Sequence, residues 1–381
     1  MEILINNTSA FLKLKQDSFL YFIFNPKTSI PIFTELFLLR MYVKIGQSVN
    51  RDVSLIINEQ AKILNNTVDC CKIVDKRIPS KTILAIGGYC PTIEPRISAF
   101  DPNTQTWVDI PEEYCKGMPN LYYHKSLQVN RDIYFVGGCT VNGMPLDTAT
   151  KWDMDDFSWS PLPRMFHRRN FLSLESYGNR HIYAIGGSNG RQRLKNVEVF
   201  DIHHQCWKPA SKMNFARSDG TSVFIDNHIY AIGGYNGQFV QNSVEFYDVT
   251  KDEWYIFGSS MKHFRRGHSA VGIQNCIYVA GGFGSHRLNS LEMIDIREGK
   301  WHFLNPMFKS RSNFSMSKFE CGMYALGGCD QQSSIIDDSE KYDIIAGKWK
   351  PCSSLKYKLS AHSSIVLEYD TAIKSLLNYN L

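Results

Sequence analysis

The stretch Ile277-Tyr-Val-Ala-Gly-Gly-Phe283, followed by Leu291-Glu-Met-Ile-Asp295 and Trp301, decides the fold because it recurs along the chain. Each copy ends an apolar run in a Gly-Gly pair, and the pairs begin at Gly87, Gly137, Gly186, Gly233, Gly281 and Gly327. A tryptophan follows each pair, at Trp107, Trp159, Trp207, Trp254, Trp301 and Trp349, with an aspartate six residues before it. A period of about 50 residues with these marks is typical of one propeller blade. The sequence therefore predicts a mainly β, six-bladed propeller.

The repeated residues are interpreted as packing residues. A Gly-Gly pair at the end of a strand indicates a positive φ or the close approach of a neighbouring blade, which a Cβ would block. The tryptophans supply apolar area between twisted sheets, and their indole N–H can reach a backbone carbonyl. We therefore assign the six tryptophans a structural role.

The first repeat lacks the strand that precedes the glycine strand in every other repeat. The segment Leu359–Tyr369, beyond the last tryptophan, has the length and composition of that missing strand. We predict that it completes the first blade and closes the ring, which removes the exposed edges of an open array. The predicted propeller spans residues 81–369, and residues 370–381 form a C-terminal tail.

Residues 1–80 carry none of the repeat marks. Apolar residues three and four apart predict helices over 11–23, 30–43 and 53–64. The run 30–43 contains Glu35 and Arg40 and is shorter than the ~20 residues of a membrane span. No signal peptide pattern precedes it. The expectation is a short α-helical segment ahead of the propeller and no membrane partner.

An arginine and a glutamate recur together in four repeats. The arginines are taken as Arg168, Arg217, Arg265 and Arg311, of which Arg168 lies two residues further from its Gly-Gly pair than the other three. The glutamates are Glu198, Glu245, Glu292 and Glu340. The second repeat has Leu121 and Thr150 at these sites and so lacks both. Because the arginine and the glutamate are either both present or both absent in these repeats, we predict that they form a partly buried ion pair that stabilises each blade that carries them.

With these residues in view, the repeat resembles the kelch motif, and residues 81–369 resemble a complete kelch propeller. Residues 7–23 and 33–44 are similar to the helical BACK domain, which in the BTB-BACK-kelch family links a BTB domain to the propeller. The Asn-, Ile-, Lys- and Tyr-leaning composition is similar to poxvirus kelch-like proteins. The chain starts within the BACK-like region, which is shortened, with no BTB sequence before it.

The resemblance implies a substrate adaptor for ubiquitination. In that family the BTB domain binds a cullin and the propeller face binds the protein to be modified. The expected function is a truncated viral adaptor that binds a host protein or peptide in the host cytoplasm and modulates cullin-dependent ubiquitination. Without a BTB domain, cullin binding by this chain alone is not expected.

The predicted partner-binding face surrounds one mouth of the ring. Its members are of three kinds: residues after the Gly-Gly pairs, residues two after the repeated arginines, and arginines in neighbouring loops. They are Tyr89, Ser188, Tyr235 and Phe283; Asp219 and Asn313; and Arg169, Arg191, Arg266 and Arg287. Aromatic and polar side chains around a mouth favour peptide recognition. The arginines predict a basic rim, and ordinary solvated arginine is the alternative.

The alternative function is a kelch-propeller enzyme, of the oxidase or isomerase type, acting on a small molecule in the central channel. The sequence offers no HExxH pattern, no catalytic residues, no metal ligands and no cofactor motif. His268 and His362 recur at one inner-strand site and are interpreted as core or rim residues. Net charge of +5 gives no case for nucleic acid. Buried histidines or carboxylates in the channel favour the enzyme, whereas a mouth lined by Arg and Tyr favours protein binding.

Overall fold

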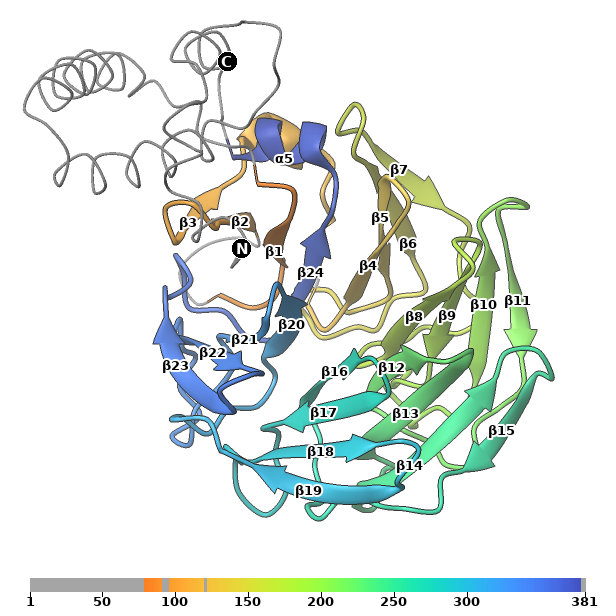
Figure 1. Cartoon of the computed structure of the whole chain (residues 1–381). Coiled ribbons are helices and arrows are strands. Elements are labelled where there is room, and N and C mark those ends of the chain that lie inside the picture. Colours follow the sequence, from red (N-terminus) through yellow and green to blue (C-terminus); the bar gives the residue numbers. More distant parts are fainter. Residues whose placement is uncertain (1–78, 91–95, 120–121, 378–381) are drawn as a thin grey trace, which may run out of the picture. The chain divides into compact units, whose positions relative to one another are not determined.

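The computed structural model describes residues 79–90, 96–119 and 122–377. The helices predicted within 1–78 lie outside these residues. The described chain forms six antiparallel four-stranded sheets, which stand as blades around a central channel (Figure 1). Consecutive inner strands contact each other around a closed circle. The predicted six-bladed propeller is confirmed.

The four strands of each blade follow one another from the centre of the ring outward. Blade 1 holds β24 (Ser363–Leu367), β1 (Thr82–Ile86), β2 (Ile97–Asp101) and β3 (Thr106–Asp109). Blade 2 holds β4 (Lys125–Val129), β5 (Asp132–Val136), β6 (Ala149–Asp153) and β7 (Trp159–Leu162). Blade 3 holds β8 (Ser173–Tyr177), β9 (His181–Ile185), β10 (Val197–Asp201) and β11 (Cys206–Ala210).

Blade 4 holds β12 (Thr221–Ile225), β13 (His228–Tyr235), β14 (Val240–Asp248) and β15 (Glu253–Ile256). Blade 5 holds β16 (Ser269–Ile273), β17 (Cys276–Ala280), β18 (Leu291–Asp295) and β19 (Lys300–Leu304). Blade 6 holds β20 (Ser315–Phe319), β21 (Gly322–Leu326), β22 (Ser339–Asp343) and β23 (Lys348–Cys352). A short 3-10 helix, η2 (Glu112–Cys115), and α5 (Asp370–Leu376) complete the described elements.

The C-terminal strand closes the ring, as predicted. β24 pairs with β1 in antiparallel register from Thr82↔Leu367 to Ile86↔Ser363. The two strands lie side by side at the junction of the orange and blue ends of the chain (Figure 1). The tail beyond it is not plain coil, because α5 buries Ala372, Ile373 and Leu376 in the core cluster of blades 1 and 2. Closure therefore joins the last residues to the first blade through both hydrogen bonds and apolar packing.

The repeated tryptophans join neighbouring blades. Each indole N–H donates to a backbone carbonyl of the preceding blade or its connection, over 2.8–3.3 Å. The acceptor of Trp107 is the carbonyl of Ser353, which spans the closure of the ring. The aspartates six residues before the tryptophans have a different role, which was not predicted from the sequence. Each carboxylate accepts the N–H two positions later, over 2.9–3.1 Å, and so fixes the turn between the two outer strands.

The Gly-Gly pair of blade 5 shows why these positions exclude side chains. Gly281 and Gly282 have φ of 61° and 96°. A Cβ on Gly281 would lie 2.6 Å from the carbonyl oxygen of Arg311, and one on Gly282 would lie 2.8 Å from the Cβ of His268. The predicted reasons, positive φ and close approach of the next blade, are both confirmed for this pair.

Six residues just ahead of the inner strands form a ring that we call the belt. They are Tyr123, Phe171, Asp219, Gly267, Asn313 and Ala361, and all have φ between 53° and 58°. Each backbone N–H donates to the carbonyl of the belt residue in the preceding blade, over 2.7–3.2 Å, so the hydrogen bonds close a circle. The belt also marks one side of the ring, the belt face, where the residues after the Gly-Gly pairs bridge to the segments entering the inner strands.

The position after the belt fills the space between blades. Leu172, Phe314, His268 and His362 occupy it, and all are buried. The ring of His268 lies against Gly233 of blade 4. Because burial disfavours the imidazolium, the pKa values of His268 and His362 fall to about 3. These histidines are core residues, as interpreted from the sequence.

The two histidines should make the propeller sensitive to acid. The unfolded chain binds a proton on each imidazole below its ordinary pKa of 6.5, whereas the folded chain binds it only near pH 3. Their contribution to stability is therefore complete above pH 6.5 and is lost as the pH falls, by up to ~2 kcal/mol per histidine at pH 5. Replacing both by leucine, as in His268→Leu with His362→Leu, should flatten the unfolding free energy between pH 7 and pH 5. An unchanged slope would contradict this assignment.

Candidate functional site

Buried arginine–glutamate pairs shape the belt face. Four such pairs lie in the described part of the chain, each with its Arg Nη2 2.6–2.9 Å from its Glu Oε1. They are Arg169–Glu198, Arg217–Glu245, Arg265–Glu292 and Arg311–Glu340. All eight side chains are at most 4% exposed. The predicted pairing is confirmed in four blades, with one wrong member.

Arg169, not Arg168, is the paired arginine of blade 3. The sequence prediction assumed a turn two residues longer than in the other blades. The turn between β8 and β9 contains three residues, one more than the Asp226–Asn227 turn of blade 4. Arg168 is exposed and lies 3.9 Å from Asp147. The prediction that Arg169 belongs to the partner-binding face is wrong for the same reason, since its side chain is fully buried.

Each glutamate also holds the segment that crosses from the outer strand of one blade to the inner strand of the next, which we call a strap. Glu245 accepts the N–H groups of Asn214 and Phe215 at 2.6 and 3.2 Å. Arg217 completes the link by donating to the carbonyl of Gly233 at 2.8 Å. The same arrangement recurs in the other three blades. The ion pair thus fixes the strap against the Gly-Gly strand.

The fixed straps present phenylalanines to solvent. The four are Phe166, Phe215, Phe264 and Phe308, with 42–67% of each exposed. All four lie within three residues of a paired arginine, so they belong to the blades that carry the ion pair. Sequence reasoning missed them because it treated the straps only as connections. The sequence signal that could have identified them is a phenylalanine one to three residues before each paired arginine.

Inside this outer arc, arginines and aromatic rings alternate across blades 3 to 5. The arginine–aromatic row consists of Arg193, Tyr235, Arg266, Phe283 and Arg287. Arg193 and Arg266 lie 5.3 and 5.2 Å from the Tyr235 ring centroid, and Arg266 and Arg287 lie 5.4 and 5.8 Å from that of Phe283. These distances are those of cation–π contacts. The row brings together four predicted site residues and adds Arg193, which sequence reasoning missed.

Among the described residues, no carboxylate forms an ion pair with the guanidinium groups of the row. Arg287 donates to the hydroxyls of Ser312 and Ser333 at 2.9 and 3.0 Å. Asp219 of the belt is the carboxylate that two arginines of the row, Arg193 and Arg266, influence through space. Burial raises the pKa of Asp219, against the effects of Ser218, Arg193 and Arg266. The row therefore carries net positive charge beside the belt.

The remaining predicted site residues divide between the surface and the interior. Arg191 is exposed, and Tyr89 is 49% exposed and packs edge-on against Tyr122 with ring centroids 5.9 Å apart. Asn313 and Asp219 are belt residues, and the residue equivalent to them in blade 3 is Phe171. Ser188 is buried, and its hydroxyl accepts the N–H of Gly190, so it is not exposed on the face.

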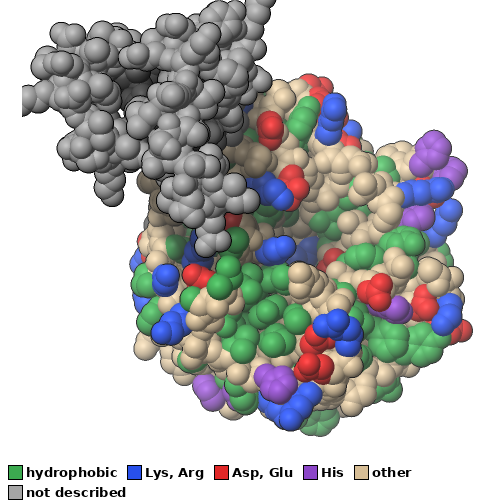
Figure 2. Space-filling view, viewed as in Figure 1, with side chains coloured by type: hydrophobic (Ala, Val, Ile, Leu, Met, Phe, Trp, Pro, Cys, Tyr) green, Lys and Arg blue, Asp and Glu red, His purple; other side chains and the backbone are tan. Residues whose placement is uncertain are grey.

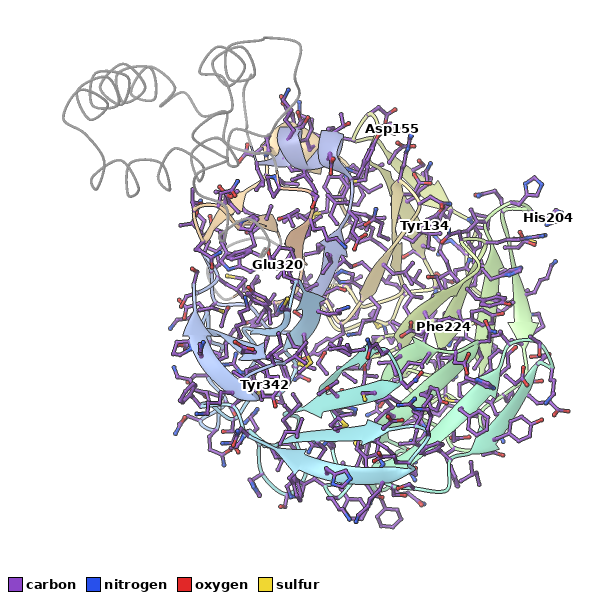
Figure 3. All side chains as sticks on the ribbon, viewed as in Figure 1. Tyr134, Asp155, His204, Phe224, Glu320 and Tyr342 are labelled. Atoms are coloured by element: carbon purple, nitrogen blue, oxygen red, sulfur yellow. The ribbon has the colours of Figure 1, made fainter. Side chains whose placement is uncertain are left out.

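The turns between the two outer strands of each blade lie on the side of the ring opposite the belt face. Figure 3 shows His204 and Asp155 on turns at the periphery, whereas Phe224 lies near the middle of the ring.

Within the described ranges, no three His, Cys, Asp or Glu side chains group closely enough to hold a metal ion. No helix in this part of the chain is long and apolar enough to cross a membrane.

Six blades, each with a terminal Gly-Gly strand and a tryptophan bonded to its neighbour, define a kelch-type β-propeller. The KLHDC2/KLHL20/DRC7 Kelch-repeats domain model matches residues 78–282 and 219–372, and the chain belongs to this family. Kelch propellers are typically protein-interaction modules.

Curated relatives match parts of this chain at low identity. Kelch repeat-containing protein kel-10 of Caenorhabditis elegans is 28% identical over 163 residues, which is 41% of this chain and 28% of that protein. Spermatocyte protein spe-26 of the same organism is 30% identical over 140 residues, 35% of this chain and 24% of that protein. Kelch repeat and BTB domain-containing protein 2 of Ectromelia virus is 31% identical over 106 residues, 28% of this chain and 19% of that protein.

Proposed function

We propose that the belt face of this propeller binds an acidic segment of a partner protein. The observation that carries the proposal is the arginine–aromatic row, in which three guanidinium groups lie over two aromatic rings and form no ion pair with a carboxylate in the described part of the chain. Such a row offers flat apolar area together with charge-assisted hydrogen-bond donors. The exposed strap phenylalanines extend the apolar contact outward, so a segment mixing acidic and apolar residues fits best.

The cellular role that we infer is substrate recruitment for ubiquitination. Support comes from the resemblance to the BTB-BACK-kelch family and from relatives whose names join kelch repeats to a BTB domain or an F-box. The match to an Ectromelia virus protein supports a viral adaptor that acts on a host protein in the cytoplasm. In this proposal the propeller selects the partner.

Acidic peptides should bind, and the Arg266→Ala variant should bind them about tenfold more weakly, because Arg266 contacts both rings of the row. The probes are fluorescein-labelled peptides with alternating Glu and Leu and the same peptides with Gln for Glu, followed by fluorescence anisotropy. Arg297→Ala is the matched control, since Arg297 is exposed and paired with Asp295 at 2.6 Å. Added salt should weaken binding to the wild type.

Equal binding of the Gln peptides, or unchanged binding by Arg266→Ala, would remove the acidic-segment proposal. Affinity capture with the full chain and with Arg266→Ala then tests the cellular role. The expected result is a co-purified protein that is lost with the variant, and a protein captured equally by both would contradict recruitment through the row.

A further inference from the structure

The central channel is a blind well that opens away from the belt face. The inner strands surround a cavity of about 650 Å³, whose lining includes Ser126, Glu175, Phe224 and Lys318. A smaller space of about 50 Å³ follows at the belt end. Tyr123 and Phe171 narrow that end, with ring centroids 4.0 Å apart. On the face seen in Figure 2, the middle of the ring is hollowed, and Lys or Arg side chains lie in the hollow.

The wall of the well is rich in hydroxyl groups that bond to one another. Ser126 and Ser363 lie 2.8 Å apart, and Ser317 and Ser364 lie 2.7 Å apart, in each case joining neighbouring blades. Val271, Met316 and Ile365 add apolar area between them. A volume of this size with a mixed lining is that of a small-molecule site.

Two ionisable side chains reach the inner part of the well from adjacent strands. Lys125 on β4 lines the space next to the belt, and Glu175 on β8 lines the cavity itself. Glu175 accepts a hydrogen bond from the hydroxyl of Ser222 at 3.0 Å. Lys125 and Glu175 influence each other's pKa through space, but no hydrogen bond joins them. Each therefore lacks a counter-ion in direct contact among the described side chains.

Burial affects both groups in the direction expected of an enclosed site. It lowers the pKa of Lys125 and raises that of Glu175 to about 7, in each case against the effect of the other group. Asp219, His268 and His362 also line the small space beside Lys125. Asp219 accepts a hydrogen bond from Ser218 and is influenced by Arg193 and Arg266, and the two histidines are neutral because burial lowers their pKa to about 3. At the mouth, Lys81 pairs with Glu368 at 2.6 Å and Lys318 is exposed. Lys125 and Glu175 are thus the charged pair that a ligand would meet in the inner part of the well.

The charges of a ligand decide whether it can satisfy this pair. A simple anion would match Lys125 but would bring negative charge beside Glu175, and a simple cation would do the reverse. A neutral molecule would leave both groups without a counter-ion. A zwitterion matches both and carries no net charge into the enclosed site, which keeps its desolvation cost low. Its remaining polar groups meet the serine hydroxyls.

We propose that the well binds a small zwitterion of the amino-acid class, with its carboxylate on Lys125 and its ammonium group toward Glu175. This site opens on the side opposite the arginine–aromatic row, so it does not depend on the proposed protein-binding function. The structure assigns it a binding role, and no covalent step is part of it.

Titration calorimetry with the full chain tests the site. The probes are the common L-amino acids, with acetate and ethylammonium as single-charge controls. We expect at least one amino acid to bind and neither control to bind at the same concentrations. Lys125→Met and Glu175→Gln should each weaken binding at least about tenfold. Lys348→Met, which removes an exposed lysine from outer strand β23, should leave binding unchanged.

Proton release gives a second readout that does not rely on the stability of the variants. Because burial raises the pKa of Glu175 to about 7, this carboxyl is partly protonated at neutral pH. A bound ammonium group favours its ionised form, so binding should release a fraction of a proton per ligand. Titrations in buffers of different ionisation enthalpy measure this release, and Glu175→Gln should abolish it. Absence of binding by every amino acid, equal binding of acetate, or no proton release in the wild type would overturn the proposal.

Discussion

A chain that ends at residue 358 is expected to lose the cooperative unfolding transition of the propeller. The deletion removes β24, so β1 loses its five-residue pairing and blade 2 loses the contact between Ser126 and Ser363. It also removes Leu367, which is completely buried, and the apolar face of α5. Whole domains are stable by only about 5–15 kcal/mol, and the deletion leaves β1 as an unpaired edge strand. The measurement is denaturant unfolding followed by tryptophan fluorescence.

A chain that ends at Glu368 is the matched control. It keeps β24 and removes α5, so it should unfold cooperatively with a lower midpoint. If the chain ending at 358 unfolded at the midpoint of the full protein, the tail strand would not be part of the first blade.

Glu245→Gln should reduce the unfolding free energy by about 3–5 kcal/mol, the usual cost of breaking one buried ion pair. The glutamate oxygens accept from Asn214, Phe215 and Arg217, all donors. An amide would place its own N–H₂ group against one of these donors, and Arg217 would remain buried without a counter-ion.

Blade 2 supplies the natural control for this substitution. Thr150 holds the glutamate position there, between Phe135 and Pro161 in the sheet register. Thr150→Ala should change the unfolding free energy by less than ~1 kcal/mol. A loss below 1 kcal/mol for Glu245→Gln would show that the pair does not stabilise the blade.

The architecture could be predicted from the sequence because its determinants are local and repeated. Gly281, Gly282 and Trp301 mark a strand end and an inter-blade contact in each copy, and six copies leave little freedom in the fold. The closure by β24 followed from one missing strand. Ion pairing followed from the joint absence of Arg and Glu in one repeat.

The binding face could be predicted only in part, because it depends on loop lengths. Arg193 and Arg287 bridge to Ser188 and Phe283 at equivalent places in the structure. They nevertheless lie at different distances from their glycines, since one loop is longer by a residue. The same difficulty placed Arg168 where Arg169 belongs. Spacing from a fixed glycine cannot decide such cases, since one inserted residue exchanges a buried side chain for an exposed one.

The well was beyond prediction for another reason. Lys125 and Glu175 occupy different positions along their inner strands, so no repeat comparison aligns them. Only the closed circle of inner strands brings them to one channel, where Glu175 lines the large cavity and Lys125 the smaller space next to the belt. Our two proposals therefore place a small-molecule site in the channel and a protein-binding site at the arginine–aromatic row.

The ring closed by β24 underlies each of these sites, and a cysteine cross-link tests it most directly. Ala85 faces Ser364 across the closure, and Ala231 faces Ser222 at the equivalent place within blade 4. Chains carrying Ala85→Cys with Ser364→Cys, or Ala231→Cys with Ser222→Cys, are oxidised while folded, and their disulfide-linked peptides are identified by mass spectrometry. The structure predicts that both pairs form their link with similar yield. A link in the blade 4 pair without one between positions 85 and 364 would contradict the closed ring.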